Sequence, residues 1–463
     1  MKKFYKLMWL LPVFLGAGIN AQVKERVPAP SFRHDYSKTL VMKIALAVPD
    51  GKGGSKVFIN FEKALEIIKE TDAITLGIPK IIYLVGWQYN GHDDKYPAFF
   101  EVNEHLKRPG DKTAKESITW LYEEAKKYHT TISLHINMTD AYDDSPLWKT
   151  YVDNGLISKN ADGSLMVIGN YNNRKAYQIN YREEWQKGFA QKRIDGLLQL
   201  LPFLTEAGTI HIDAWIAREN KHAYETVVEE ASFQKKIARY WIDKRIDPTS
   251  EWAMDYMTGL IPYYWHFNHR TQNDFLDIPA HTVTGGHFNP DLKTSDFGLE
   301  FLFGTSMYGE NLFPGANNRN VSTENWHLAF IRDFYLNTLQ YYFLNSLQRL
   351  SVTGAGAGRT AFFSAGVKVS LEDSTVVQAN SILRKGSTVC FPVLWRKDGS
   401  RAAYSVKDTL ITFRLPEDWM RAKRIVASEI GQTGLKKIEM IQPVNGQFTI
   451  RLKSQRPLLL QPE

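Results

Sequence analysis

The first half of the chain alternates short apolar runs with amphipathic segments. Four apolar runs, each predicted to form a buried strand, lie at 40–46, 80–85, 131–135 and 209–213. The helical spacing of apolar residues predicts helices over 61–71, 117–128 and 182–201. Short strands that alternate with helices are typical of parallel βα units. Doubling these four units predicts a (β/α)8 TIM-like barrel of the α/β class, ending near residue 350.

The pattern is less regular after the fourth run and changes character near Ser351. Strands five to seven of the barrel are predicted at 246–251, 278–283 and 299–303, with a helix over 326–348. A glycine-rich break at 354–358 follows, and then come alternating runs at 367–371, 388–395, 409–415 and 447–452. Short alternating runs separated by turns predict an antiparallel β-sandwich. The expected domains are the barrel over 22–350 and the sandwich over 351–463.

Residues 1–21 have the pattern of a secretory signal peptide. A lysine-bearing start precedes the apolar run 7–15, and small residues lead to a cleavage site after Ala21. The run is too short to span a bilayer, and no other segment approaches the required length. We therefore expect an exported protein, periplasmic or secreted. The single cysteine, Cys390, excludes an internal disulfide and is expected to be a buried apolar residue.

Composition narrows the possible partners. The net charge of +7 is spread along the chain rather than clustered in a basic block, which argues against nucleic acid as a partner. Aromatic residues make up 13% of the chain, which suits either a large core or a site that stacks on sugar rings. If the aromatic residues do form a sugar site, the expected partner is a glycan or glycoprotein substrate; no membrane span is expected.

Two carboxylates stand at the ends of predicted strands, where barrel enzymes place their active sites. Asp213 ends the fourth apolar run, and Glu251 ends the predicted fifth strand. Glycoside cleavage needs one carboxylate that faces the anomeric carbon and a second acid that protonates the leaving oxygen. Asp213 is therefore the candidate nucleophile and Glu251 the candidate acid/base. The alternatives are that Asp213 caps the next helix and that Glu251 lies on a solvated loop.

Side chains that could bind a sugar follow the same predicted strands. The hydrogen-bonding candidates are His92, Asp93, His135 and Asn137. The candidate stacking platforms are Trp87, Trp215 and Trp252. Each polar candidate could equally be a satisfied group at a strand end. The histidines lack the His-Glu-x-x-His spacing, so no metal site and no cofactor are predicted, while a structural calcium ion on the Asp-rich stretch 140–144 stays open.

The order and spacing of four segments resemble the catalytic barrel of glycoside hydrolase family 101, the endo-α-N-acetylgalactosaminidases. The segments are 86–94, 135–137, 212–215 and 250–252, within a resemblance that covers roughly 40–370. Members of that family remove Gal-β1,3-GalNAc from serine or threonine of mucin-type glycoproteins, with retention of configuration. The resemblance implies Asp213 as nucleophile, Glu251 as acid/base, and His92 and Asp93 as sugar-binding residues, with Asn137 near the same pocket.

The chain departs from this family in two ways. Known members are often far longer, and the stretch after Gly86 differs from the pattern of the best-known ones. These departures leave the sugar specificity open. An α-galactosidase-like enzyme of different α-sugar specificity is one alternative to an α-N-acetylgalactosaminidase. A catalytically silent barrel that binds glycans through its tryptophans is another.

Overall fold

The computed structural model describes residues 31–287, 296, 298–307, 312–313 and 326–463. The predicted signal segment 1–21 lies outside the described residues. Within them, no helix combines the length and the apolar character needed to cross a membrane.

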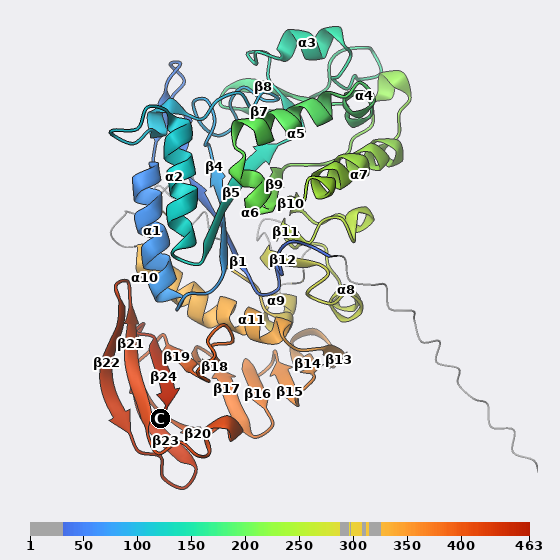
Figure 1. The fold of residues 1–463 in the computed structure, drawn as a ribbon. Coiled ribbons are helices and arrows are strands. Elements are labelled where there is room, and N and C mark those ends of the chain that lie inside the picture. The colour runs from blue at the N-terminus through green and yellow to red at the C-terminus, as the bar shows by residue number, and fades with distance from the viewer. Residues whose placement is uncertain (1–30, 288–295, 297, 308–311, 314–325) are drawn as a thin grey trace, which may run out of the picture.

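A parallel sheet forms the first part of the molecule (Figure 1). Its seven strands follow the order β1-β4-β5-β9-β10-β11-β12. Their bounds are β1 Leu40–Ala45, β4 Lys80–Val85, β5 Thr130–Asn137, β9 Thr209–Asp213, β10 Asp247–Trp252, β11 Tyr263–His266 and β12 Thr284–His287. The first four of these lie on the four predicted apolar runs, and β10 lies on the predicted fifth strand. Continuous burial explains the match, since every residue of β1 and β4 is buried.

Helices connect the strands and cover the outside of the sheet (Figure 1). They are α1 Phe61–Ile74, α2 Ala114–Lys126, α3 Trp148–Asp153, α4 Tyr181–Gln186, α5 Phe189–Leu200, α6 Phe203–Ala207, α7 Val227–Asp243, α8 Gln272–Asp277 and α9 Gly298–Phe303. Side-chain caps define several helix starts. Asn60 accepts a hydrogen bond from the Lys63 amide at α1, and Thr226 forms a capping box with Glu229 at α7.

The parallel sheet curls as expected for a TIM-like barrel, although within the described residues it has seven strands rather than the predicted eight and β12 does not pair with β1. Tyr36, just before β1, stacks on Tyr263 of β11 with ring centroids 5.9 Å apart. Lys43 of β1 lies 4.2 Å from the centre of the Trp265 ring, also on β11. These contacts join the first and sixth strands of the sheet across its inner face. They bring the residues at the carboxyl ends of the strands toward one another.

Three predicted elements of the barrel were wrong or incomplete. Segment 299–303 is not a strand but helix α9, because Leu299, Leu302 and Phe303 are buried with helical spacing. The sixth strand is not 278–283, which forms the turn before β12, but the aromatic stretch Tyr263–His266, buried on both faces without any alternation. The helix predicted over 182–201 is two helices, because Gly188 adopts a left-handed φ of 77° between them.

The last part of the chain is antiparallel, as predicted. The long helical stretch α10 Trp326–Asp333, a π-helical turn and α11 Leu339–Asn345 lead into it (Figure 1). A ten-stranded sheet follows, with strands β13 Arg349–Thr353, β14 Thr360–Phe363, β15 Val367–Ser370, β16 Thr375–Gln378, β17 Ser381–Lys385, β18 Thr388–Pro392, β19 Arg401–Ser405, β21 Ile425–Gly431, β22 Gly434–Ile441 and β24 Leu458–Pro462. A separate pair, β20 Thr409–Arg414 and β23 Gln447–Leu452, packs over the larger sheet.

A second apolar core lies between the two antiparallel sheets. Phe413 and Phe448 of the strand pair meet Ile425 and Leu460 of the ten-stranded sheet there. Cys390 is buried in the same core, as predicted for a small apolar residue. Helix α11 joins this part of the chain to the barrel, with Phe343 lying 5.4 Å from Phe391 between ring centroids.

Candidate active site

The register of two neighbouring strands places Asp213 and Glu251 side by side. Strands β9 and β10 run parallel, and Ile212 pairs with Ser250. The next residue on each strand is the carboxylic acid, so both acids leave the sheet at the same level. The two side chains keep limited access to solvent, with 15% of Asp213 and 20% of Glu251 exposed. This is the carboxyl edge of the barrel, where active sites of this fold lie.

Histidines hold Asp213 in its ionised form. The His135 Nε2 atom, on β5, lies 3.3 Å from Asp213 Oδ2. The His92 ring packs edge-on against His135, with centroids 5.1 Å apart. Burial alone favours the neutral acid, but the interactions with His135, and the charges of His92 and Lys43, outweigh it and lower the pKa of Asp213 far below its usual value.

Glu251 has the opposite tendency. Burial, followed by the negative charge of Asp213, raises the pKa of Glu251 to about 8. The Ala214 amide donates a hydrogen bond to Glu251 Oε2 at 3.2 Å, and His266 Nε2 lies 3.7 Å from Glu251 Oε1. Two acids on adjacent strands are thus separated in protonation by their surroundings: one is an anion and the other holds a proton at neutral pH.

Ala214 links the two acids through its backbone. It follows Asp213 directly and has a left-handed φ of 43°. Its N–H is bonded to Glu251, while its carbonyl accepts a hydrogen bond of 3.0 Å from the Thr139 hydroxyl. The Thr139 hydroxyl also contacts the Tyr181 hydroxyl at 2.8 Å. A backbone conformation that is costly for alanine is therefore held from both sides.

Lys43 places a cation inside the barrel beneath these acids. It is buried in the middle of β1, over the Trp265 ring. Burial and the Lys43 charge lower the pKa of His266 to about 3. Burial also lowers the pKa of His135 to about 4; the charge of Asp213 raises this pKa, but burial and the Lys43 charge outweigh it. Both histidines are therefore neutral at pH 7, and the Lys43 charge favours the ionised form of both acids.

The loop after β4 brings His92 and Asp93 to the same place. Gly86 and Gly91 have φ values of 76° and 129°, and a Cβ on either would lie within 2.5 Å of the Ala47 carbonyl oxygen. Only glycine permits this close approach of the loop to the strand that follows β1. His92 Nε2 lies 3.4 Å from Asp93 Oδ2, and both side chains remain partly exposed. Burial, with the charge of Asp213, raises the pKa of Asp93 although His92 opposes the shift.

Four of the predicted sugar contacts have other surroundings. His135 is buried and its Nε2 atom faces Asp213, so it supports the acid rather than lying open to a sugar. Trp87 and Trp215 are fully buried, so neither ring can serve as the predicted stacking platform; the Trp87 indole instead donates to the His135 carbonyl at 3.0 Å. Asn137 is also buried, and its side-chain oxygen accepts hydrogen bonds from the amides of Thr139 and Asp140. It shapes a turn rather than facing a ligand. Trp252 is half-buried, with its ring 4.5 Å from that of His266.

Sequence analysis missed several groups around the acids. Lys43 was detectable as the one charge within an otherwise apolar strand. Asp140 is buried, accepts a hydrogen bond of 3.0 Å from the Asn137 amide, and has a pKa raised by burial and by the charges of Asp93 and Asp213. Tyr171 is 42% exposed, and its pKa is raised by burial and by the charges of Asp140, Asp93 and Asp213. Tyr171 carries no local signal, since only folding brings it to the site, whereas Asp140 belongs to the Asp-rich stretch 140–144 that the sequence indicated only as a possible calcium site.

The same cluster has the donor set of a metal site. His92, His135 and Asp213 each offer one ligand atom, and these atoms lie within 4.8 Å of one another. Imidazole and carboxylate ligands suit zinc and related ions. A metal ion at this position would engage the carboxylate of Asp213, so metal binding and attack by that carboxylate on a sugar are mutually exclusive uses of the group.

A parallel barrel with two acids of opposite protonation at adjacent strand ends is the arrangement that glycoside hydrolases use. The family model described as endo-alpha-N-acetylgalactosaminidase matches residues 20–266, more than half of the chain. The chain belongs to this family, glycoside hydrolase family 101.

Solved structures of one bacterial enzyme are similar in fold. The GalNAc complex of the alpha-N-acetylgalactosaminidase NagBb from Bifidobacterium bifidum matches with a TM-score of 0.52 and 12% identity, over 74% of this chain and 58% of that one. Its ligand-free form matches with a TM-score of 0.51 and 14% identity, over 73% and 57%. At this identity the match establishes the fold, and the chain spans just over half of NagBb. No curated protein matches the sequence significantly.

Proposed function

We propose that the protein is a retaining glycoside hydrolase that cleaves α-linked N-acetylgalactosamine from glycoproteins. The bond is that between GalNAc and serine or threonine in core-1 O-glycans, and the product is the disaccharide Gal-β1,3-GalNAc. The observation that carries the proposal is the pair of acids that the register of β9 and β10 places side by side at the carboxyl edge of the sheet. The surroundings lower the pKa of Asp213 and raise that of Glu251, as the two roles require. Membership of the endo-alpha-N-acetylgalactosaminidase family supports the choice of sugar.

In this mechanism Asp213 attacks the anomeric carbon and forms a glycosyl-enzyme intermediate. Glu251 gives its proton to the leaving serine or threonine oxygen, then takes a proton from the water that hydrolyses the intermediate. The positions support these roles, since the Ala214 amide ties Glu251 to the residue after Asp213. His92 and Asp93, partly exposed beside Asp213, are the proposed hydrogen-bonding contacts to the sugar hydroxyls.

A substrate panel tests this function. Aryl α-glycosides of GalNAc, galactose and glucose should be compared with a core-1 glycopeptide, and the released sugar identified. We expect the disaccharide from the glycopeptide, and NMR of the first product should give the α anomer. Release of monosaccharide galactose from the aryl galactoside alone would point to an α-galactosidase-like enzyme. Sugar binding without any hydrolysis would point to a silent glycan-binding barrel.

We also propose that the protein acts outside the cytoplasm, on the basis of the signal-like residues 1–21. Expression of the full chain in a bacterial host, followed by fractionation, checks this. Amino-terminal sequencing of the mature protein should begin at Gln22. Recovery of an uncleaved chain from the cytoplasm would contradict export.

A further inference from the structure

A β-hairpin that contributes no acid to the site nevertheless holds the loop that carries His92 and Asp93. The hairpin consists of β7 Val167–Tyr171 and β8 Arg174–Gln178, joined by a two-residue turn. Both turn residues, Asn172 and Asn173, have left-handed φ values, of 51° and 61°. This is the geometry of a tight hairpin turn, so the tip is sharply defined and Arg174 has a fixed starting point.

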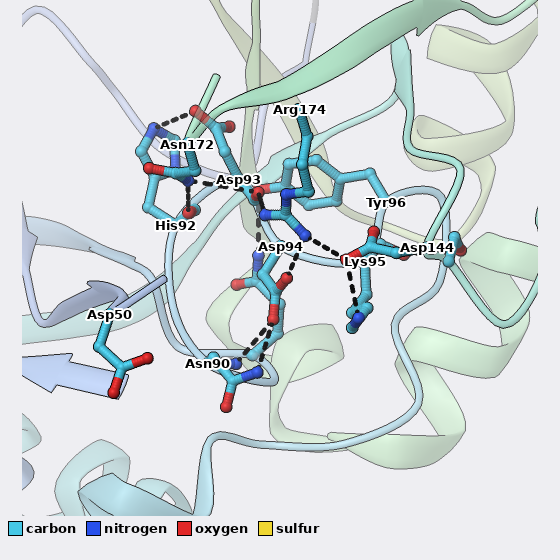
Figure 2. A network of polar contacts seen from close by, with 12 residues as sticks. Asp50, Asn90, His92, Asp93, Asp94, Lys95, Tyr96, Asp144, Asn172 and Arg174 are labelled. Carbon is cyan, nitrogen blue, oxygen red and sulfur yellow. Dashed lines mark hydrogen bonds and ion pairs between the residues drawn. The ribbon is translucent and has the colours of Figure 1, made fainter. Parts of the chain in front are cut away.

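Arg174 spans the base of that loop (Figure 2). Its Nη2 atom donates to the Asp93 carbonyl oxygen at 2.6 Å, and its Nη1 atom donates to Asp94 Oδ1 at 2.7 Å. The same Nη1 contacts Asp144 Oδ2 at 2.5 Å. The guanidinium group therefore joins the Asp93 backbone to the carboxylate of Asp94 in the same loop and to that of Asp144, which follows β5. A planar fork of donors is needed for this, which lysine lacks.

The loop needs such support because its backbone is strained. Asp93 and Lys95 both have left-handed φ values, 57° and 62°, although neither is glycine. Conformations of this kind persist only where the surroundings enforce them. Asn172, at the hairpin tip, adds a hydrogen bond of 3.1 Å from its amide to the His92 carbonyl oxygen. Asp94 in turn accepts the Asn90 amide at 3.1 Å, which extends the restraint along the loop.

We propose that Arg174 is a positioning residue that sets the sugar-binding geometry of His92 and Asp93. It acts through the backbone of Asp93, and its own guanidinium group is bound by carboxylates rather than directed at the substrate. The proposal rests on the proposed function in one respect, the role of His92 and Asp93 as sugar contacts. The hairpin that carries Arg174 would therefore affect substrate binding, although Arg174 lies 80 residues beyond Asp94 in the chain.

Two measurements test it, with Lys175 as the matched control. Lys175 is the exposed neighbour of Arg174, so Lys175→Met removes the same charge next to the clamp without touching it. In hydrogen exchange, the peptide covering 86–95 should exchange faster in Arg174→Met and in Arg174→Lys, and at the wild-type rate in Lys175→Met. Exchange needs no substrate, so it tests the clamp even if the wild-type protein cleaves none of the glycosides. Unchanged exchange in Arg174→Met would overturn the proposal.

Kinetics on the best aryl glycoside supply the second measurement. We expect KM to rise roughly tenfold in Arg174→Met with kcat within about threefold of wild type, because misplaced binding groups weaken substrate binding. A general loss of folded enzyme would instead lower kcat and leave KM unchanged, which would contradict positioning. In combination with Asp93→Asn, the Arg174→Met change should cost much less than alone. Additive effects of the two substitutions would also overturn it.

Discussion

The ends of strands β9 and β10 present the same chemical group in two different environments. Asp213 lies against His135, and the histidine interactions together with the Lys43 charge keep it ionised. Glu251 lies one strand away and accepts a hydrogen bond from the Ala214 amide, which lowers its pKa. Burial and the Asp213 charge outweigh this contact and raise the pKa of Glu251, so it keeps a proton. The ionised Asp213 is thus one of the causes that keep Glu251 protonated. Separate pKa values, rather than residue type, divide the proposed roles of nucleophile and proton donor.

The aromatic residues that follow these acids differ as well. Trp215 is buried, and its carbonyl accepts a hydrogen bond of 2.7 Å from the Gln234 side chain. Trp252 is half-buried and tilts over His266. Similar sequence segments, an acid with a tryptophan close behind, therefore have one ring in the core and one at the edge of the site.

The largest expected effect is that of Asp213→Asn. Removing the attacking anion should reduce kcat on every substrate by on the order of 10⁴-fold or more. Circular dichroism and the melting temperature should show a folded protein. The same change removes the charge that raises the pKa of Glu251, so that pKa should fall. A variant with wild-type turnover would contradict the nucleophile role.

Glu251→Gln should depend on the leaving group. A natural serine or threonine glycoside needs protonation, so kcat/KM on the glycopeptide should fall by roughly 10² to 10⁴-fold. Aryl glycosides with acidic phenols need little protonation and should retain most of their rate of glycosyl-enzyme formation. Comparing phenols of graded acidity measures this. Equal losses for all leaving groups would argue that Glu251 is not the acid.

The pH dependence of kcat/KM checks the division of protonation directly. Activity requires Asp213 ionised and Glu251 protonated, and the pKa of Glu251 is about 8, so the alkaline limb should lie near pH 8. Lys43 lowers the pKa of both acids, so Lys43→Met should move this limb to higher pH. Lys43→Arg keeps the charge, and its limb should stay in place.

The smallest expected effects separate the two tryptophans. Trp252→Ala should raise KM by about 2- to 10-fold, the value of an aromatic contact of about 0.5–1.5 kcal/mol, with little change in stability. Trp215→Phe, in the core, should instead lower the free energy of unfolding by about 1–3 kcal/mol and leave KM near wild type. Substrate titration and chemical denaturation measure the two quantities. If Trp215→Phe raised KM and Trp252→Ala lowered the stability instead, the difference in burial between the two rings would not explain their roles.

The sequence by itself determined the first four parallel strands, because continuous apolar burial leaves a local pattern in each run. It also located β10, through the polar run that ends in Glu251 and Trp252 rather than through apolar residues. It also determined the two acids at strand ends and the antiparallel character of the last part of the chain. It could not locate β11, because the four-residue run Tyr263–His266 is too short to distinguish a buried strand from another buried segment. Nor could it distinguish helix α9 from a strand, since a six-residue apolar segment fits either pattern until its neighbours are known.

Only the tertiary structure decided which tryptophan is accessible, that Asn137 supports a turn, and that Arg174 holds the loop of His92 and Asp93. It also decided the different protonation of Asp213 and Glu251. These properties depend on burial and on charges that meet across strands, such as the Lys43 charge on β1 acting on acids of β9 and β10. Distances between residues far apart in the chain leave no local pattern in the sequence, and the electrostatics of the site depends on those distances.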